Sequence, residues 1–469
     1  MHNRRVRLED LLAAMKFKFF PWATLSRLGS AFVVALTTTF AAEVTWIGDS
    51  GDWHTASNWS SAPDLPGPDD DVVIDRPGDI TVTHSSGTHS VKSLLCQEAF
   101  VLSGGSLTVS NTVQVNNGFS LPGGTLAGGT VLQGTNGQPI TVTSGTLDGV
   151  SLASDVSLAN NTILSITNGL TLVGGVAITL NSAGFIVIDV NPGTQMIGGT
   201  GQIVLAGTSD QNYLRLGNGG TTTLTLGPNV TVRGQGSIMQ AQSGSMLVNQ
   251  GTIQADVSGQ TLGVSLSSFT NSGTLRALNG GTLSLSGNWN NSGIIHASSG
   301  GTVSISGSYS LAGGTLNVGI NSATDYGRIN FTGPLTASGE FTVGTINGFR
   351  PNPGDTFTVL TYASATNEFA CYSGLDLGGG LFLVPHFGKT RLTLTAATYT
   401  TNTTQPQLFI SRSLTGVRIV WPLGFTNWEL QTTTNLSSPV WGSVSAQCDN
   451  QAVVPAPAPA QYFRLRHGN

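Results

Sequence analysis

The chain has 469 residues, of which only 9% are charged, whereas globular proteins average about 25% charged residues. Residues 1–41 have a net positive charge. The rest of the chain carries 13 basic and 22 acidic side chains, a formal charge of −9. No lysine occurs between Lys92 and Lys389, so the middle of the chain lacks the basic stripe that binds nucleic acid or anionic lipid. These features exclude nucleic acid as an expected partner.

The N-terminus has the pattern of a secretory signal peptide, which we predict at residues 1–42. Basic residues precede a 13-residue apolar stretch at 28–40, and the small residues after it favour cleavage at Ala41 or Ala42. The acidic residues at positions 9 and 10 make Met15 a candidate start. The apolar stretch falls short of the roughly 20 residues that span a bilayer, and no later stretch is long enough. We therefore expect a secreted or cell-surface protein with no membrane span in the mature chain.

Short β-strands are the predicted local structure of most of the chain. Single Val, Leu and Ile residues alternate with Thr and Ser, and this period of two is typical of strands. The 62 glycines, about twice the usual share of roughly 7%, indicate frequent turns. Regularly placed apolar residues argue against disorder, which is the alternative for a chain rich in Gly and Ser.

An internal repeat is the strongest signal in the sequence. LVNQGTIQA at 247–255 is followed by FTNSGTLRA at 269–277 and WNNSGIIHA at 289–297, and a fourth unit begins at Tyr309. A unit of about 20 residues cannot bury its own apolar face, but stacked units can, with each strand about 4.8 Å from its copy. The pattern predicts a right-handed parallel β-helix. A β-sandwich array would have a period nearer 90 to 100 residues, which the sequence does not show.

The repeat also predicts which residues lie above one another. GGTLSLSG at 280–287 recurs as GGTVSISG at 300–307, which places Leu283 over Val303 and Leu285 over Ile305. The sequence also repeats an asparagine two residues before a glycine. We predict that each asparagine bonds the backbone and its copy one coil away, and that each glycine adopts a backbone angle that other residues resist. The asparagines are Asn249, Asn271 and Asn291, and the glycines are Gly251, Gly273 and Gly293.

Both ends of the repeat region change in composition, as a solenoid requires, because its terminal coils expose sheet edges. We predict an N-terminal cap and first coil at 43–90 and β-helix coils at 91–320. Closing coils and a C-terminal cap follow at 321–398. A Thr-rich linker at 399–406 leads to a small β-module at 407–469.

Three segments resemble a family of large secreted bacterial β-helix proteins, the adhesin-like or autotransporter-passenger-like proteins. The coils resemble the family's Asn-x-Gly and Gly-Gly-Thr repeats, and residues 325–362, with Gly354 and Asp355, are similar to the segment that closes such helices. The family's N-terminal motif is matched by Trp46, Gly51, Asp52, Trp53, Asn58, Trp59, Pro66 and Asp71. A true autotransporter ends in a membrane β-barrel, which does not follow residue 398, so the export route stays open.

The residues after the linker form a different unit. It resembles a C-terminal module attached to many exported bacterial repeat proteins, which implies a role in sorting or surface retention. We interpret its aromatic residues as its small core, with a sugar-binding platform as the alternative. These residues are Trp421, Trp428, Trp441 and Phe463.

Two groups of residues are candidate binding sites. Asp69, Asp70 and Asp71 form the densest carboxylate cluster and are candidate calcium ligands, although a solvated turn is the favoured interpretation because the EF-hand spacing is missing. Phe269, Trp289 and Tyr309 occupy equivalent places in three coils. This ladder either stacks sugars or, as we favour, stacks on itself in the core.

An enzyme is not the favoured interpretation. Between Ser93 and Gly388 there are 11 acidic and five basic residues, without any adjacent or alternate pair of aspartates. The basic residues are Arg215, Arg233, Arg276, Arg328 and Arg350. Asp210 and Arg215 lie where a loop breaks the repeat, as a functional loop of an enzyme would, but a structural loop is the favoured interpretation. His296 falls between two inward residues and is predicted to point outwards as a solvated side chain.

The three cysteines, Cys96, Cys371 and Cys448, are widely separated, so at most one disulfide is expected and buried free thiols are favoured. We predict a non-enzymatic extracellular or cell-surface scaffold, adhesin-like in character and without a cofactor. The alternatives are a polysaccharide lyase or glycoside hydrolase on a β-helix, and a carbohydrate-binding surface protein. Glycans or other surface proteins are the expected partners. A groove with three or more charged residues on one coil face would favour the enzyme.

Overall fold

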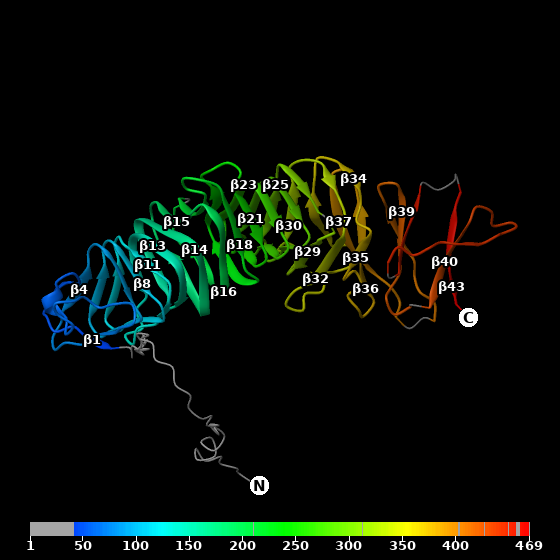
Figure 1. Ribbon diagram of the computed structural model, residues 1–469. Helices are drawn as coiled ribbons and strands as arrows, with labels where there is room; N and C mark the ends of the chain where they lie inside the picture. Colours follow the sequence, from blue (N-terminus) through cyan, green and yellow to red (C-terminus); the bar gives the residue numbers. More distant parts are fainter. Residues whose placement is uncertain are drawn as a thin grey trace, which may run out of the picture. The chain divides into compact units, whose positions relative to one another are not determined.

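The computed structural model describes residues 42–468 except 210, 312, 402–403, 426, 449 and 456–459. The predicted signal peptide lies almost wholly outside the described residues. The described chain is all-β, and 35 of its strands form one continuous hydrogen-bonded sheet. These strands wind into a parallel β-helix of about 12 turns, as the sequence predicts (Figure 1). Parallel pairing between successive coils excludes the sandwich alternative.

The coils begin at β1 (Glu43–Thr45), and their length varies along the helix. The early strands are short, up to β12 (Thr130–Leu132), whereas the next ones bend around the corners of the coil, as β13 (Ile140–Ala153), β14 (Val156–Leu180) and β16 (Gly193–Leu205) do. Leu107 pairs with Leu126, 19 residues on, but Val190 pairs with Leu216, 26 residues on. The looser repeat upstream of residue 245 therefore reflects coils of unequal length.

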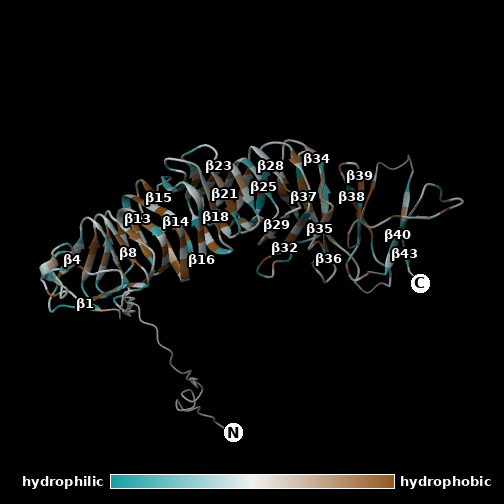
Figure 2. Ribbon diagram, viewed as in Figure 1, coloured by the Kyte–Doolittle hydropathy of each residue, from teal (hydrophilic) through white to brown (hydrophobic). Residues whose placement is uncertain are grey.

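The register between 247 and 314 is the one that the repeat predicts. In β23 (Thr261–Asn271) and β25 (Thr282–Asn291), Phe269 pairs with Trp289. Leu283 pairs with Val303 and Leu285 with Ile305, which belong to β27 (Thr302–Ile305). All four aliphatic residues are fully buried. Figure 2 shows hydrophobic and hydrophilic segments distributed along the coils.

The asparagine ladder is confirmed. Asn249 donates a 2.7 Å hydrogen bond from Nδ2 to Oδ1 of Asn271, which donates a 2.6 Å bond to Oδ1 of Asn291. Each Nδ2 also donates to the carbonyl of the glycine two residues on. Because these side chains are buried, each bond satisfies a group that would otherwise be costly to desolvate.

The predicted reason for the glycines in this ladder is wrong. Gly251, Gly273 and Gly293 are absent from the residues with positive φ. A Cβ at Gly273 would instead lie 2.2 Å from the carbonyl oxygen of Gly251, and one at Gly293 would lie 2.1 Å from that of Gly273. Glycine is needed because each turn packs directly on the backbone of the coil below.

The N-terminal cap closes the core with tryptophan. Trp46, Trp53 and Trp59 are at most 1% exposed and pack edge to face, with ring centroids 4.7 to 4.8 Å apart. The Trp59 Nε1 atom donates a 2.8 Å hydrogen bond to the Trp53 carbonyl. These large rings thus cover the apolar core at the first described coil.

The C-terminal end closes by changing strand direction. β33 (Thr356–Thr361) and β36 (Leu381–Phe387) both pair antiparallel with β37 (Arg391–Thr398). The module that follows has two three-stranded antiparallel sheets. One contains β38 (Phe409–Arg412), β39 (Gly416–Val420) and β42 (Gln451–Pro455), and the other contains β40 (Trp428–Thr433), β41 (Gly442–Ser443) and β43 (Tyr462–His467).

Candidate functional site

One face of the β-helix carries a row of polar side chains, which we call the polar column. Five stacked strands supply it: β19 (Asn229–Gly234), β22 (Thr252–Ala255), β24 (Thr274–Ala277), β26 (Ile294–Ala297) and β29 (Thr315–Ile320). Their register places one outward residue of each strand directly beside the next. The polar column consists, in order, of Arg233, Gln254, Arg276, His296 and Asn317.

A hydrogen-bond network orients the first half of the polar column. Arg233 donates to Oδ2 of Asp256 from both Nε and Nη2, each at 2.9 Å. The same oxygen accepts a 2.6 Å bond from Nε2 of Gln254, whose Oε1 in turn accepts from Nε of Arg276. Asp256 is 7% exposed, whereas Arg233 is 38% exposed. The buried carboxylate of Asp256 thus holds Arg233 directly and Arg276 through Gln254.

Arg276 and Arg328 differ from the other three basic residues between Ser93 and Gly388, because no acceptor is recorded for their terminal nitrogens among the described residues. Arg233 and Arg215 pair with carboxylates, Arg328 lies 4.3 Å over the Tyr326 ring, and Arg350 donates to two backbone carbonyls. Within the described part of the chain, the neutral oxygen of Gln254 is the only hydrogen-bond acceptor recorded for Arg276. The terminal nitrogens of this guanidinium are therefore available to a ligand.

His296 points outwards, as predicted, but it is half-buried and not solvated. Its Nε2 lies 3.0 Å from the Ser298 hydroxyl. Burial and, to a smaller extent, the positive charge of Arg276 lower the pKa of His296. The lowered pKa favours the neutral form of the imidazole.

A shallow groove of about 410 Å³ lies beside the arginines of the polar column. It is lined by small, polar and basic residues from five successive coils. The lining residues are Gly175, Thr200, Gly201, Gln202, Asn229, Thr231, Arg233, Gln254 and Arg276. The groove therefore offers hydroxyl and amide groups together with two guanidinium groups.

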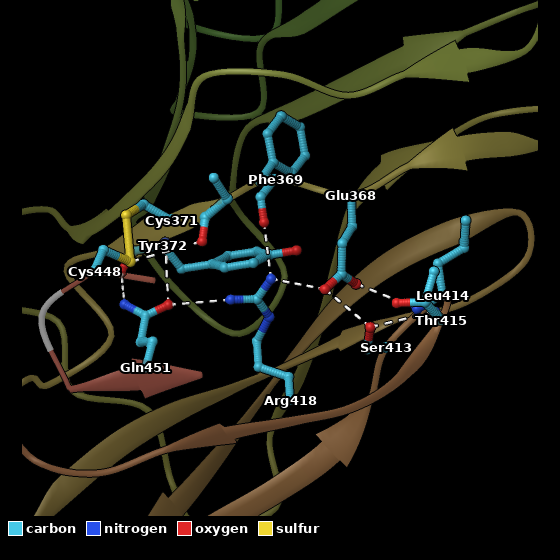
Figure 3. Close-up of polar contacts among 11 residues, drawn as sticks. Glu368, Phe369, Cys371, Tyr372, Ser413, Leu414, Thr415, Arg418, Cys448 and Gln451 are labelled. Atoms are coloured by element: carbon cyan, nitrogen blue, oxygen red, sulfur yellow. Dashed lines mark hydrogen bonds and ion pairs between the residues drawn. A yellow bond between two sulfur atoms is a disulfide. The ribbon is translucent and has the colours of Figure 1, made fainter. Parts of the chain in front are cut away.

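A second polar cluster lies where the module meets the last coils (Figure 3). Arg418 of β39 is 2% exposed and donates a 2.7 Å bond to Glu368 and a 2.8 Å bond to the Phe369 carbonyl. Its guanidinium also lies 4.5 Å over the ring of Tyr372. Glu368 accepts further bonds from the Ser413 hydroxyl and the Leu414 amide. This buried ion pair joins the module to the last coils, although the Nε of Arg418 has no hydrogen-bond partner.

A disulfide joins the same two parts of the chain. Cys371 of β35 (Cys371–Ser373) is bonded to Cys448, 77 residues later, with their Cα atoms 5.9 Å apart. The expectation of free thiols is therefore wrong for these two residues, because the docked module brings them together. It is confirmed for Cys96, which is buried and free, and whose burial raises its pKa to about 12.

The predicted calcium ligands do not converge. Asp71 bonds Lys92 at 2.8 Å and the Ser93 hydroxyl at 2.5 Å, and both hydrogen bonds lower its pKa. Asp70 accepts from the Gly67 amide at 2.7 Å, while Asp69 is exposed. Across the described ranges, no group of three or more His, Cys, Asp or Glu residues is arranged to hold a metal ion.

The aromatic ladder lies at the core and not on a face. Phe269 is 1% exposed and Trp289 is 4% exposed, and their ring centroids are 5.9 Å apart. Trp289 is 6.1 Å from Tyr309, which continues the stack to Phe331 at 5.1 Å. The half-buried Tyr309 donates its hydroxyl to the Pro334 carbonyl. This arrangement agrees with the self-stacking interpretation.

The module's aromatic residues divide into two pairs. Trp421 belongs to the module's core, and Phe463 packs against it, as predicted. Trp428 instead contacts His467, and Trp441 lies under the guanidinium of Arg464, 4.1 Å from its ring centre. These two tryptophans are half-buried and lie outside the core cluster.

The segment that breaks the repeat includes an ion pair with the preceding coil. Asp210 lies outside the described residues. Arg215 forms a bidentate pair with Asp189, at 2.6 and 2.7 Å, and the Asp189 side chain is fully buried. Asn218 donates a further bond to the same carboxylate. This partner, one coil earlier, was not identified from the sequence.

A cluster of three histidines next to the N-terminal cap was also missed. Nε2 of His84 lies 2.8 Å from Nδ1 of His89, and Nδ1 of His84 lies 2.9 Å from the Gly104 carbonyl. The ring of His54 is 4.5 Å from that of His89. His84 is fully buried against Trp53. Burial and the neighbouring imidazoles lower the pKa values of His84 and His89.

The polar column had a signal in the sequence. Gln254, Arg276 and His296 occupy the same position in the three aligned repeats, so their stacking follows from the repeat itself. Arg418 and Glu368 had no such signal, because they are 50 residues apart in unlike elements.

Comparisons with known protein families and curated proteins found no match. Among the residues that the structure describes, no helix has the length and hydrophobicity needed to cross a membrane.

Proposed function

We propose that the protein is a non-enzymatic scaffold outside the cell, either secreted or held on the cell surface in the manner of an adhesin. In this proposal the β-helix is a stiff support and the C-terminal module is its attachment or recognition end. The observation that carries the proposal is the Cys371–Cys448 disulfide, which links the module to the closing coils. Disulfides persist in oxidising compartments and are rare in the cytosol, which supports export.

The contacts between the module and the closing coils, which we call the junction, centre on Arg418 and Glu368. They support a module held in a fixed position. Arg418 and Glu368 are buried together, and each has additional hydrogen-bond partners. Removing one member of such a pair leaves an uncompensated buried charge. Gln451 adds bonds to the Tyr372 amide and carbonyl, at 3.2 and 2.5 Å. A module held by these contacts and by a covalent bond would transmit force to the coils.

The coils supply the stiffness. Each one pairs only with its neighbours, and the 35-stranded sheet leaves no gap along the helix. Buried asparagine and aromatic ladders tie successive coils together through side chains as well as backbone.

The test is fractionation of the producing cell. The full chain is compared with a chain lacking residues 399–469 and with a Cys448→Ser variant, and thiol labelling reports the disulfide. We expect the full chain outside the cytoplasm and oxidised, and the truncated chain released from the cell surface. A full chain that stays in the cytoplasm with reduced cysteines would overturn the proposal.

A second candidate is a polysaccharide-active enzyme, and one observation favours it. Arg233, Asp256 and Arg276 form a network of three charged residues on one coil face beside a groove. Against catalysis, the Oδ2 atom of Asp256 is already engaged by three donor atoms of Arg233 and Gln254, and the side chain is only 7% exposed. Incubation with acidic and neutral polysaccharides, followed by assays for reducing ends and unsaturated products, decides between the two.

A further inference from the structure

We propose that the polar column and its groove bind an acidic polysaccharide, with the terminal nitrogens of Arg276 holding a carboxylate or sulfate group of the sugar chain. This inference rests on the proposed function, since it assigns a ligand to the extracellular scaffold. It adds a binding face on the coils, away from the C-terminal module.

The guanidinium of Arg276 is oriented but only partly engaged. An arginine fork binds carboxylate or sulfate through two parallel hydrogen bonds. Gln254 occupies only the Nε of Arg276, and this bond fixes the orientation of the fork. Gln254 is itself held by Asp256, so the binding geometry exists before any ligand arrives.

Neutral polar groups surround this cation. The groove is lined by Gln202, Asn229 and Thr231 as well as by the arginines. Amide and hydroxyl groups bond the many hydroxyls of a sugar, and the small Gly175 and Gly201 leave room for its ring. A sparse positive charge among neutral polar groups matches an acidic sugar chain, in which one anion accompanies several hydroxyls.

Polar side chains repeat along the coil axis. His296 and Asn317 continue the polar column beyond Arg276, one residue per coil at the inter-strand spacing of about 4.8 Å. A linear polymer can contact several of these levels, whereas a small anion contacts one. The acidic remainder of the chain and the presence of Asp256 in the network disfavour nucleic acid, whose charge density demands more cations.

The experiment measures binding of the full chain to polygalacturonate, to sulfated dextran and to neutral dextran by affinity electrophoresis at low salt. Arg276→Gln removes the cation while keeping a polar side chain, and Arg328→Gln is the matched control on another coil face. We expect at least one acidic polymer to bind, Arg276→Gln to weaken binding about tenfold, and Arg328→Gln to change it by less than about twofold. Thermal unfolding of each variant checks that the fold is intact.

The outcomes separate the sources of the anion. Tighter binding of polygalacturonate assigns the site to carboxylate, and tighter binding of sulfated dextran assigns it to sulfate. Equal weakening by both variants, or no binding of either acidic polymer, overturns the inference. Because binding is measured with purified protein, that failure leaves the localisation result unaffected, and a cytoplasmic location leaves the binding result unaffected.

Discussion

The junction and the polar column use arginine for opposite purposes. Arg418 is 2% exposed and is surrounded by a carboxylate, a carbonyl and an aromatic ring. Arg276 is half-buried, and a neutral amide oxygen holds its Nε. A buried guanidinium paired with a carboxylate holds structure together, whereas a half-buried guanidinium whose terminal nitrogens lack an acceptor is available for binding. The contrast predicts that one arginine governs stability and the other governs binding.

The largest expected effect is on the junction. Arg418→Met leaves Glu368 buried without its cation, so we expect the module's attachment to lose about 3–5 kcal/mol of stability. Limited proteolysis in the 399–406 segment and thermal unfolding measure the change. Arg276→Gln is the matched control, with an expected shift within about 0.5 kcal/mol. If both variants unfold at the same temperature, the contrast between the two arginines is wrong.

Removing the disulfide tests the same junction through its covalent link. Cys448→Ser is expected to lower the stability of the docked module by about 2–4 kcal/mol, because the crosslink restricts the unfolded chain. Urea unfolding under oxidising conditions measures the difference, and the wild-type chain after reduction serves as the comparison. The prediction fails if Cys448→Ser and the oxidised wild type have the same unfolding midpoint.

A smaller effect is expected in the coil that carries Arg276. Gly273→Ala places a Cβ 2.2 Å from the Gly251 carbonyl oxygen, and overpacking of this kind costs about 1–3 kcal/mol. At Gly344 an added Cβ meets no atom within 4 Å, and φ is not positive, so Gly344→Ala is the matched control. Thermal unfolding compares the two. Equal melting temperatures would show that the coils relax around the added methyl group.

The smallest effect concerns acid and the N-terminal cap. In the folded chain burial lowers the pKa of His84 below its ordinary value, so the unfolded chain binds the proton more readily as the pH falls. The cap should therefore lose stability from about pH 6.5 downward, until the folded-state pKa is reached. Hydrogen exchange of the first coils across this range measures it. His84→Gln should flatten the profile relative to wild type, and an unchanged profile would contradict the assignment.

The sequence alone determined the β-helix, the register from 247 to 314 and the asparagine ladder. A repeat of nearly constant length sets which residues stack, and alternation sets which face inward, so these features follow from local pattern. The same alignment places Gln254, Arg276 and His296 above one another. It does not show that Asp256 links Gln254 and the arginines by hydrogen bonds.

Only the tertiary structure decided the Arg418–Glu368 pair, the Cys371–Cys448 disulfide and the packing reason for Gly273. The first two join residues 50 and 77 positions apart in elements that do not repeat, so no period in the sequence relates them. The third depends on how closely two backbones approach, which side-chain patterns do not encode. The stacking of the coils can be predicted from the sequence because the coils repeat. The contacts that attach the module occur once, so no repeat predicts them.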